Sequence, residues 1–204
     1  MKIHECDQLS AEWFKVRAGM PTASEFDTVQ ASGKGGGESK TRRTYMLKLA
    51  GERITGEPME AYSNPYLERG KAMEDEARSY YAFSTNAELK RVGFIHDEKH
   101  GAGCSPDALI GDNGGLEIKT AAPHILIDHI ERDQIPTGHI AQCQGFLWIA
   151  QREYIDLSIY WPKMPPFIKR VTRDEGYIAR LAGEVRRFND ELAAIVEKIK
   201  RYNT

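Results

Sequence analysis

The sequence contains few cysteines, and their placement excludes the sites that cysteines commonly build. Three are present in 204 residues, at Cys6, Cys104 and Cys143. Their number is odd and their spacings are wide, so they match neither a zinc-binding pattern nor a disulfide framework. We therefore expect free thiols in a reducing cytoplasm.

Long apolar runs and an excess of charge of one sign are also lacking. No run approaches the roughly 20 apolar residues that span a bilayer, and residues 1–9 lack the apolar core of an export signal. Lys and Arg number 28 and Asp and Glu 30, a net charge of −2, whereas proteins that coat DNA through its phosphates are usually basic. We expect no membrane contact, and net charge neither indicates nor excludes nucleic-acid binding.

What the chain does have is the composition and patterning of one ordinary domain. Hydrophobic residues make up 41% of it, and their periodicity predicts a mixed α/β (α+β) fold over residues 1–204. Residues 30–40 hold four glycines, so a mobile surface loop is expected there. The expected helices cover 10–29 with an interruption at 21–24, 41–53, 64–83, 138–150 and about 174–202, and the expected strands cover 91–96, 105–110, 116–120, 154–161 and 167–172.

The most informative segment is 105–120. Residues 111–115 are turn formers between two strand-like flanks, which predicts a β-hairpin. Because side chains alternate across a strand, Glu117 and Lys119 share one face, while the two apolar residues beside Glu117 face the core. Asp107 precedes the turn and can point to the side of Glu117. Two carboxylates and an ammonium would then meet at one edge of the hairpin.

The same three residues have an ordinary interpretation, in which Asp107 and Glu117 are solvated and Lys119 is their surface partner. Three details favour a site instead. Pro106 fixes the backbone that enters the hairpin, and charges interrupt a strand that would otherwise be apolar. A third carboxylate, Glu74, lies on a helix just upstream.

Pro106-Asp107 followed by Glu117-Ile118-Lys119 resembles the PD-(D/E)XK nuclease signature. Around it, the sequence resembles the phage lambda-type recombination exonucleases, the YqaJ-like viral recombinases of that superfamily, over roughly residues 10–150. The matching blocks, which occur in the family's order, are Trp13, Arg17, Gly19 and Thr22-Ala23-Ser24; Gly70-Lys71, Glu74, Asp75, Ala77 and Arg78; Cys104 to Asp107 with Leu109; Leu116 to Lys119; and Ala141 to Gln144 with Trp148. An ordered series is much harder to obtain by chance than one short motif.

The resemblance implies a restriction-endonuclease-like sheet flanked by helices, with a catalytic core over about residues 64–150. It implies Mg²⁺-dependent 5′-to-3′ digestion of one strand of linear double-stranded DNA to 5′-mononucleotides, which leaves a 3′ single-stranded overhang. It further implies a ring-shaped homotrimer, a single-strand annealing protein as partner, a phage or prophage source, and action in the bacterial host cytoplasm.

The resemblance also assigns roles at the metal site. Magnesium prefers oxygen ligands, and the family pattern places Asp107, Glu117 and the backbone carbonyl of Ile118 on one ion. Glu74 matches an additional acidic residue that serves a second ion, and Mn²⁺ can substitute. Lys119 would orient or deprotonate the attacking water and stabilise the charge of the transition state.

Four further matches concern the water and the strand end. Gln142 would hold the nucleophilic water or a neighbour, the alternative being a helix-surface glutamine. Arg17 and Ser24 match residues that bind a terminal 5′-phosphate, and Ser105 is placed to add a donor. The alternatives are a helix-surface cation for Arg17 and a helix cap for Ser24.

The remaining candidates are weaker. Lys34 and Lys40 would contact the DNA backbone or be solvated, and Leu67 would be either an apolar wedge that splits the strands or a core residue of its helix. The chain departs from the lambda enzyme at His139, where that enzyme has tyrosine, and its C-terminal third resembles it only in pattern.

Two rival functions stay open. One is another PD-(D/E)XK nuclease, an endonuclease or a RecB-like enzyme, which shares the metal site and lacks the end-binding pocket. The other is a non-catalytic DNA-binding protein of the same fold, which the presence of all three core residues disfavours.

Overall fold

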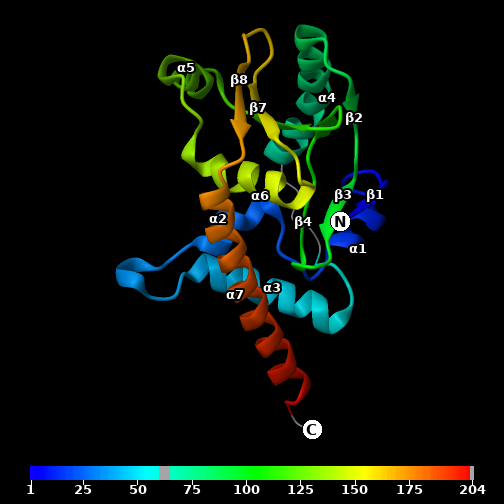
Figure 1. The fold of residues 1–204 in the computed structure, drawn as a ribbon, viewed down its shortest axis with the longest axis vertical. Coiled ribbons are helices and arrows are strands. Elements are labelled where there is room, and N and C mark those ends of the chain that lie inside the picture. The colour runs from blue at the N-terminus through cyan, green and yellow to red at the C-terminus, as the bar shows by residue number, and fades with distance from the viewer. Residues whose placement is uncertain (60–64, 203–204) are drawn as a thin grey trace.

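The structure, a computed structural model, describes residues 1–59 and 65–202, and the side chains of all of these except 65–72. Its strands form one sheet of five strands and one of three, with helices packed around them (Figure 1). The predicted mixed α/β fold is confirmed.

The five-stranded sheet has the order β2-β5-β6-β7-β8. Its strands are β2 (Leu89–Lys90), β5 (Ala108–Ile110), β6 (Gly114–Thr120), β7 (Tyr154–Tyr160) and β8 (Phe167–Thr172). Neighbouring strands are antiparallel except β6 and β7, which run parallel with Glu117 opposite Leu157. A parallel pair needs a crossover connection. Here the crossover consists of α5 (Pro123–Arg132), the short 3₁₀ helix η3 (Thr137–His139) and α6 (Ile140–Ala150).

The three-stranded sheet ties the N-terminus to the middle of the chain. Its order is β1 (Lys2–His4), β3 (Phe94–Asp97) and β4 (Ala102–Cys104), with Lys2 opposite His96. The sequence predicted a strand at β3 but neither β1, β4 nor the helix α5. Strands this short are held by partners far away in the sequence, so their own residues carry little pattern.

The N-terminal helices are shorter than their periodicity suggested. Ser10 caps α1 (Ala11–Arg17), because its hydroxyl accepts a hydrogen bond from the N–H of Trp13 at 3.2 Å. The chain then turns at Gly19, whose φ of +72° suits a residue without a Cβ. The 3₁₀ helix η1 (Ala23–Glu25) and helix α2 (Phe26–Gln30) follow. The predicted interruption is therefore confirmed, but it begins earlier, after Arg17, and η1 precedes the second helix.

Three long helices frame the domain. They are α3 (Lys40–Thr55), α4 (Pro65–Thr85) and α7 (Glu175–Lys200). The predicted C-terminal helix is confirmed as α7, which packs against α3 and extends away from the sheet (Figure 1). Arg42 of α3 and Glu191 of α7 form an ion pair at 2.7 Å across this contact.

The two faces of the five-stranded sheet pack against different elements. Leu157 of β7 points into the main core, which also contains residues of α2, α3, α6 and α7. Leu116 and Ile118 of β6 point to the opposite face, where Ala77 and Tyr81 of α4 close a smaller cluster. Glu117 and Lys119 therefore lie on the α6 side of the sheet.

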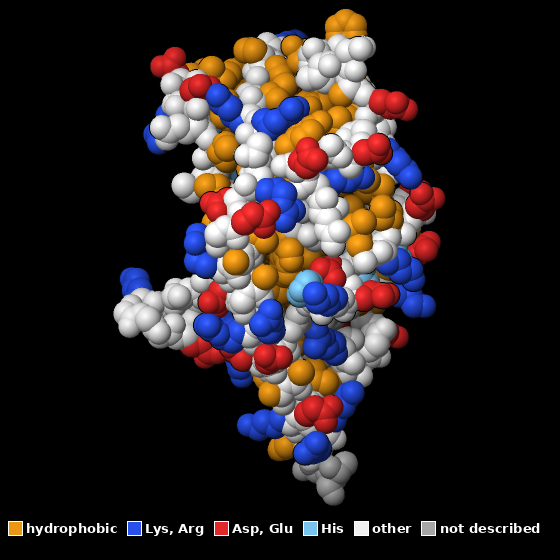
Figure 2. Space-filling model, viewed as in Figure 1, with side chains coloured by type: hydrophobic (Ala, Val, Ile, Leu, Met, Phe, Trp, Pro, Cys, Tyr) orange, Lys and Arg blue, Asp and Glu red, His pale blue; other side chains and the backbone are white. Residues whose placement is uncertain are grey.

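The surface matches the near-neutral composition. On the face shown in Figure 2, acidic and basic side chains alternate and form no broad patch of one sign. In the part of the chain that the structure describes, no helix is both long and apolar enough to cross a membrane.

Candidate active site

The hairpin of β5 and β6 brings Asp107, Glu117 and Lys119 together, as the alternation of side chains predicted. Glu117 is only 5% exposed, and Nζ of Lys119 lies 2.8 Å from its Oε1. The backbone N–H of Asp107 donates to the carbonyl of Leu116 at 3.0 Å. Its Oδ2 accepts a hydrogen bond from the N–H of Ile118. Both contacts hold Asp107 beside the strand that carries the other two residues.

Gln142 reaches the same group from helix α6. Its Nε2 donates to Oε1 of Glu117 at 2.6 Å. Lys119 contacts the same oxygen, so two donors hold the Glu117 carboxylate in one orientation. The structure thus places Gln142 at the cluster and not on an open helix surface.

The cluster carries more negative than positive charge. Burial raises the pKa of the Asp107 carboxyl well above its usual value, and the charges of Glu117 and Glu74 raise it further, although the N–H of Ile118 and Lys119 act in the opposite direction. At Lys119, burial lowers the pKa, but the charge and hydrogen bond of Glu117 outweigh it and the net pKa is raised. A surplus of carboxylate around one ammonium favours a hard divalent cation.

Helix α4 supplies Glu74 and an arginine that anchors it. Nη2 and Nη1 of Arg78 donate to Glu74 and Asp75, and its Nε donates to the carbonyl of Asp107 at 3.3 Å. Among the described residues, no three His, Cys, Asp or Glu side chains converge as a finished metal site. Asp107 and Glu117 offer a carboxylate pair, whereas Glu74 is turned toward Arg78, and its role as a ligand stays a prediction.

A cavity of about 170 Å³ opens beside the contact of Glu117 with Gln142. Arg17, Ser24 and Ser105 also line it, although they come from α1, η1 and the segment before Asp107. Residues predicted for cutting and residues predicted for end recognition therefore share one cavity, which we call the end pocket.

Arg17 is a half-buried cation whose direct contacts are an aromatic ring and a hydroxyl. Its guanidinium lies over the ring of Trp13, with Cζ 3.8 Å from the ring centroid, and its Nη2 donates to Oγ1 of Thr22 at 3.3 Å. Within residues 1–59 and 65–202 it forms no ion pair with a carboxylate, and burial lowers its pKa. A cation in this setting attracts an anion from solution, which favours the predicted phosphate role over that of a surface cation.

The two serines have hydroxyls available to the end pocket. Ser24 lies inside η1, where Thr22 occupies the cap position, so Ser24 is not the helix cap. Its Oγ is 3.3 Å from Oγ1 of Thr22. Oγ of Ser105 accepts a hydrogen bond from Nε1 of Trp13 at 2.9 Å, which leaves its own proton free to be donated.

Three sequence candidates lie elsewhere or stay open. Lys34 is exposed in the loop that projects at the left of Figure 1, and it lines no part of the end pocket. The side chain of Leu67 lies outside the described residues, so its wedge role stays a prediction. His139 precedes α6; burial lowers its pKa, and the nearby charge of Lys119 lowers it further.

Sequence reasoning missed Gln8, which also lines the end pocket. Its Nε2 donates to the carbonyls of Val92 at 3.1 Å and Pro106 at 2.9 Å. These contacts attach the N-terminal segment to the loop that precedes Asp107. No local pattern marks Gln8, because both partners lie more than 80 residues away.

Helix α6 approaches η1 closely because residue 145 is glycine. A Cβ on Gly145 would lie 2.4 Å from Cδ2 of Phe26 and 3.2 Å from Cβ of Ala23. The helix that carries Gln142 and the turn that carries Ser24 are therefore packed without a side chain of residue 145 between them.

Fold and site together define an α/β protein in which the buried Glu117 and the half-buried Asp107 and Lys119 follow the PD-(D/E)XK order on one hairpin. Residues 12–153 match the model of the YqaJ-like viral recombinase domain. The chain belongs to this family, as the sequence resemblance predicted.

Solved structures agree with this assignment. The alkaline exonuclease LHK-Exo from Laribacter hongkongensis is 31% identical, with a TM-score of 0.84 over 94% of this chain and 97% of that chain. Its complex with dAMP gives 33% identity and a TM-score of 0.85 over the same shares. A phage-related exonuclease from Haemophilus somnus, 14% identical over 86% of this chain and 95% of that chain, shares the fold with a TM-score of 0.64. No curated protein sequence matches the chain significantly.

Proposed function

We propose that the protein is a Mg²⁺-dependent 5′-to-3′ exonuclease that degrades one strand of linear double-stranded DNA to 5′-mononucleotides. The observation that carries the proposal is the end pocket, where Arg17 and two serine hydroxyls share one cavity with Glu117 and Gln142. The relatives named above as exonucleases support the same activity.

The donor set fits a hard divalent cation. Asp107 and Glu117 present carboxylate oxygens from one hairpin, and the pKa of Asp107 is raised first by burial and then by the negative charges of Glu117 and Glu74, which Lys119 opposes. These residues, with the Ile118 carbonyl and Glu74, would hold one or two Mg²⁺ or Mn²⁺ ions. A bound ion would supply charge neutralisation at the scissile phosphate and a more acidic water.

The chain's own groups would arrange the reaction. Lys119, already held 2.8 Å from Glu117, orients the attacking water and offers a positive charge to the transition state. Gln142 keeps the Glu117 carboxylate in one orientation through its hydrogen bond of 2.6 Å. The attacking water would therefore lie beside Glu117, whose carboxylate is held by Lys119 of β6 and by Gln142 of α6.

Recognition of the strand end follows from charge. A terminal 5′-phosphate carries more negative charge than an internal diester, so Arg17 with the hydroxyls of Ser24 and Ser105 would bind it more strongly. Because these residues share a cavity with Glu117, a bound end places a nearby phosphodiester at the carboxylates.

The test compares three DNA substrates with purified protein. In Mg²⁺ we expect a linear duplex with 5′-phosphates to be digested, the same duplex with 5′-hydroxyls to be digested more slowly, and covalently closed circular DNA to stay intact. EDTA should abolish digestion. Nicking of the closed circle would favour the endonuclease rival, and equal rates for the two linear ends would remove the role given to Arg17 and Ser24.

The family resemblance extends the proposal to assembly. We expect a ring-shaped homotrimer that hands the 3′ overhang to a single-strand annealing protein. Light scattering should give three times the 23.1 kDa of one chain. A monomer at all concentrations would contradict this part while leaving the chemistry untouched.

A further inference from the structure

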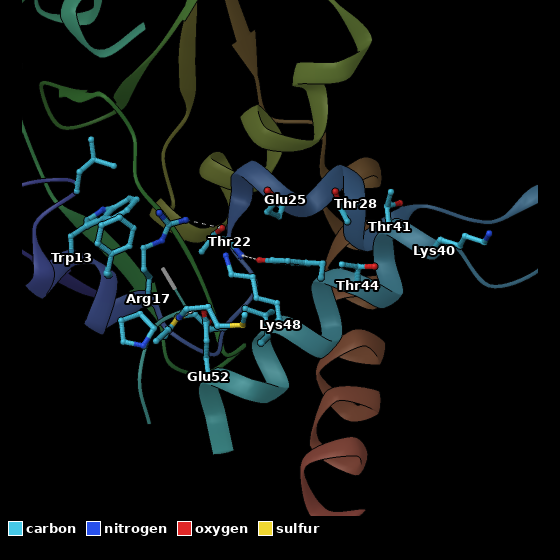
Figure 3. Close-up of a pocket in the computed structure, with 18 residues that line it drawn as sticks. Trp13, Arg17, Thr22, Glu25, Thr28, Lys40, Thr41, Thr44, Lys48 and Glu52 are labelled. Atoms are coloured by element: carbon cyan, nitrogen blue, oxygen red, sulfur yellow. Dashed lines mark hydrogen bonds between the residues drawn. The ribbon is translucent and has the colours of Figure 1, made fainter. Parts of the chain in front are cut away.

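A larger cavity adjoins the end pocket on the far side of Arg17. It measures about 660 Å³ and lies between α1, α2 and α3 (Figure 3). Trp13, Arg17 and Thr22 line both cavities, whereas Glu117 and Gln142 line only the end pocket. The order along the surface is therefore carboxylates, end pocket, Arg17 and then this second cavity, which we call the α3 groove.

One half of the α3 groove is cationic and rich in hydroxyls. Lys40, Thr44 and Lys48 recur every four residues on α3, which places them on one helix face at intervals of about 6 Å. Both lysines are exposed, and Thr28 of α2 and Thr41 stand beside them. Figure 3 shows this row leading from Lys40 past Lys48 toward Thr22 and Arg17.

The other half is apolar and aromatic. Leu9 and Met59 are 44% and 52% exposed at this end, beside Met20 and Phe14, and Phe14 packs edge to face on the buried Trp13 with centroids 5.0 Å apart. Sites for single-stranded nucleic acid combine these two features, because cations follow the phosphates and aromatic or apolar side chains receive the unstacked bases. The volume lies within the ~300–1,000 Å³ of ordinary ligand pockets, so it suits nucleotides of one strand and not a duplex.

The carboxylates of the groove leave its positive charge in excess. Glu52 is 6% exposed, and its two oxygens accept hydrogen bonds from the N–H groups of Gly19 at 2.7 Å and Met59 at 3.1 Å. Glu25 is the other acidic residue of the lining. Arg17, Lys40 and Lys48 thus outnumber the carboxylates three to two, and one carboxylate is already engaged by the backbone.

We propose that the α3 groove binds the single-stranded tail of a DNA end whose 5′ strand continues past the end pocket. The inference rests on the proposed function, because it takes Arg17 to hold a phosphate of the strand being cut. Continuity through Arg17 assigns the groove to that strand and not to its complement. With the tail in the groove, Arg17 holds an internal diester, and the carboxylates cut the strand beyond it.

The first product then differs from that of a blunt end. Water adds to phosphorus and the bond from phosphorus to the 3′-oxygen breaks. The tail leaves as an oligonucleotide with a 3′-hydroxyl, and the shortened strand keeps a 5′-phosphate. Later cuts start from this new terminal phosphate and release mononucleotides.

The test uses a duplex with a 5′ tail of a few nucleotides and a fluorophore on the 5′ end, next to a blunt 5′-phosphorylated duplex. We expect wild-type protein to release the label on an oligonucleotide. The double variant Lys40→Ala with Lys48→Ala should reduce that product several-fold and leave blunt-end digestion unchanged. Lys99→Ala with Lys198→Ala is the matched control, since these exposed lysines line neither cavity.

Binding measured by anisotropy in EDTA separates the groove from the chemistry. Two phosphate contacts on a single strand should add about 1.4 to the slope of log affinity against log salt for the tailed duplex, and the double variant should lose that increment. If the label is released only on a mononucleotide, or if the double variant loses activity equally on tailed and blunt ends, the role proposed for the α3 groove is wrong. The exonuclease proposal would still stand. Failure to digest either substrate would instead remove the proposed function.

Discussion

The central sheet buries a carboxylate on each face, and the two have opposite surroundings. Glu117 on β6 is 5% exposed and Asp156 on β7 is 4% exposed. Asp156 accepts from the hydroxyl of Tyr81 at 2.6 Å and from two nitrogens of Arg170 at 2.8 and 2.9 Å. Both of its oxygens are therefore paired within the fold. Glu117 instead borders the end pocket and lies near Asp107. Burial raises the pKa of the Asp107 carboxyl, and the charge of Glu117 raises it further.

This difference separates a structural carboxylate from a chemical one better than burial does. Burying an ionised group is costly unless partners compensate it. On the α4 side the compensation is complete, and burial followed by the hydrogen bond to Asp156 raises the pKa of Tyr81. On the α6 side the compensation is incomplete, because Asp107 and Glu117 lie near one ammonium, that of Lys119. The remaining negative charge can attract a cation. Substitutions on the two faces should accordingly change different quantities.

The largest effect is expected from Lys119→Ala. Loss of a group that stabilises transition-state charge reduces turnover by roughly 10²–10³-fold, while the free energy of unfolding should change little. Initial rates on linear duplex DNA in Mg²⁺, together with urea denaturation, measure both. Wild-type rates in this variant would remove Lys119 from the mechanism.

Gln142→Ala should have the next largest effect on activity. A residue that orients a metal ligand contributes about 10–100-fold to metal affinity or rate, and Gln142 holds Glu117 at 2.6 Å. We expect the Mg²⁺ concentration for half-maximal rate to rise. The control is Gln142→Glu, which keeps the size and removes the donor. A variant that bound Mg²⁺ normally and lost only stability would make Gln142 a packing residue.

Asp156→Ala tests the other face. Removing the carboxylate leaves Tyr81 and Arg170 without their partner and should cost about 2 kcal/mol of unfolding free energy. We discount the value below that of a fully buried pair because the Arg170 side chain is 55% exposed. Activity per folded molecule should stay near wild type. A rate loss like that of Lys119→Ala, without unfolding, would show that the two faces are not independent.

Asp107→Asn is expected to stabilise the protein without metal. The amide keeps the shape of the side chain and removes repulsion from Glu117 and Glu74, so thermal unfolding in EDTA should occur a few degrees higher, an effect of about 1 kcal/mol. Addition of Mg²⁺ should then shift the midpoint of wild type and not of the variant. An unchanged Mg²⁺ shift would exclude Asp107 as a ligand.

The hairpin shows what the sequence could predict. Turn residues between two short strands, with charges at alternate positions, predict that Asp107, Glu117 and Lys119 lie together. The contact of Gln142 with Glu117 depends on a crossover that returns α6 to β6, and only the family resemblance pointed to it. Local periodicity carries the first kind of information and not the second.

Other features lay beyond local pattern. The partners of Asp156 are 75 residues away at Tyr81 and 14 away at Arg170, so nothing near Asp156 reveals that it is compensated. The interruption at 21–24 was expected, but its earlier start after Arg17, with a turn at Gly19, was not marked by the amphipathic pattern. Arg17 packs on Trp13 and forms no ion pair among the described residues. This can be recognised only when all of its neighbours in space are known.

The close contact at Gly145 determines how near helix α6 lies to η1. A Cβ on Gly145 would collide with the ring of Phe26 and approach Cβ of Ala23, so the absence of a side chain at this residue lets α6, which carries Gln142, lie close to η1, which carries Ser24. In the proposed exonuclease, the spacing between Ser24 and the Glu117–Gln142 contact would set how far a bound strand end lies from the phosphodiester that is cut. An alanine at residue 145 would push α6 away from Phe26 and η1, and would therefore move Gln142 relative to the residues proposed to hold the strand end.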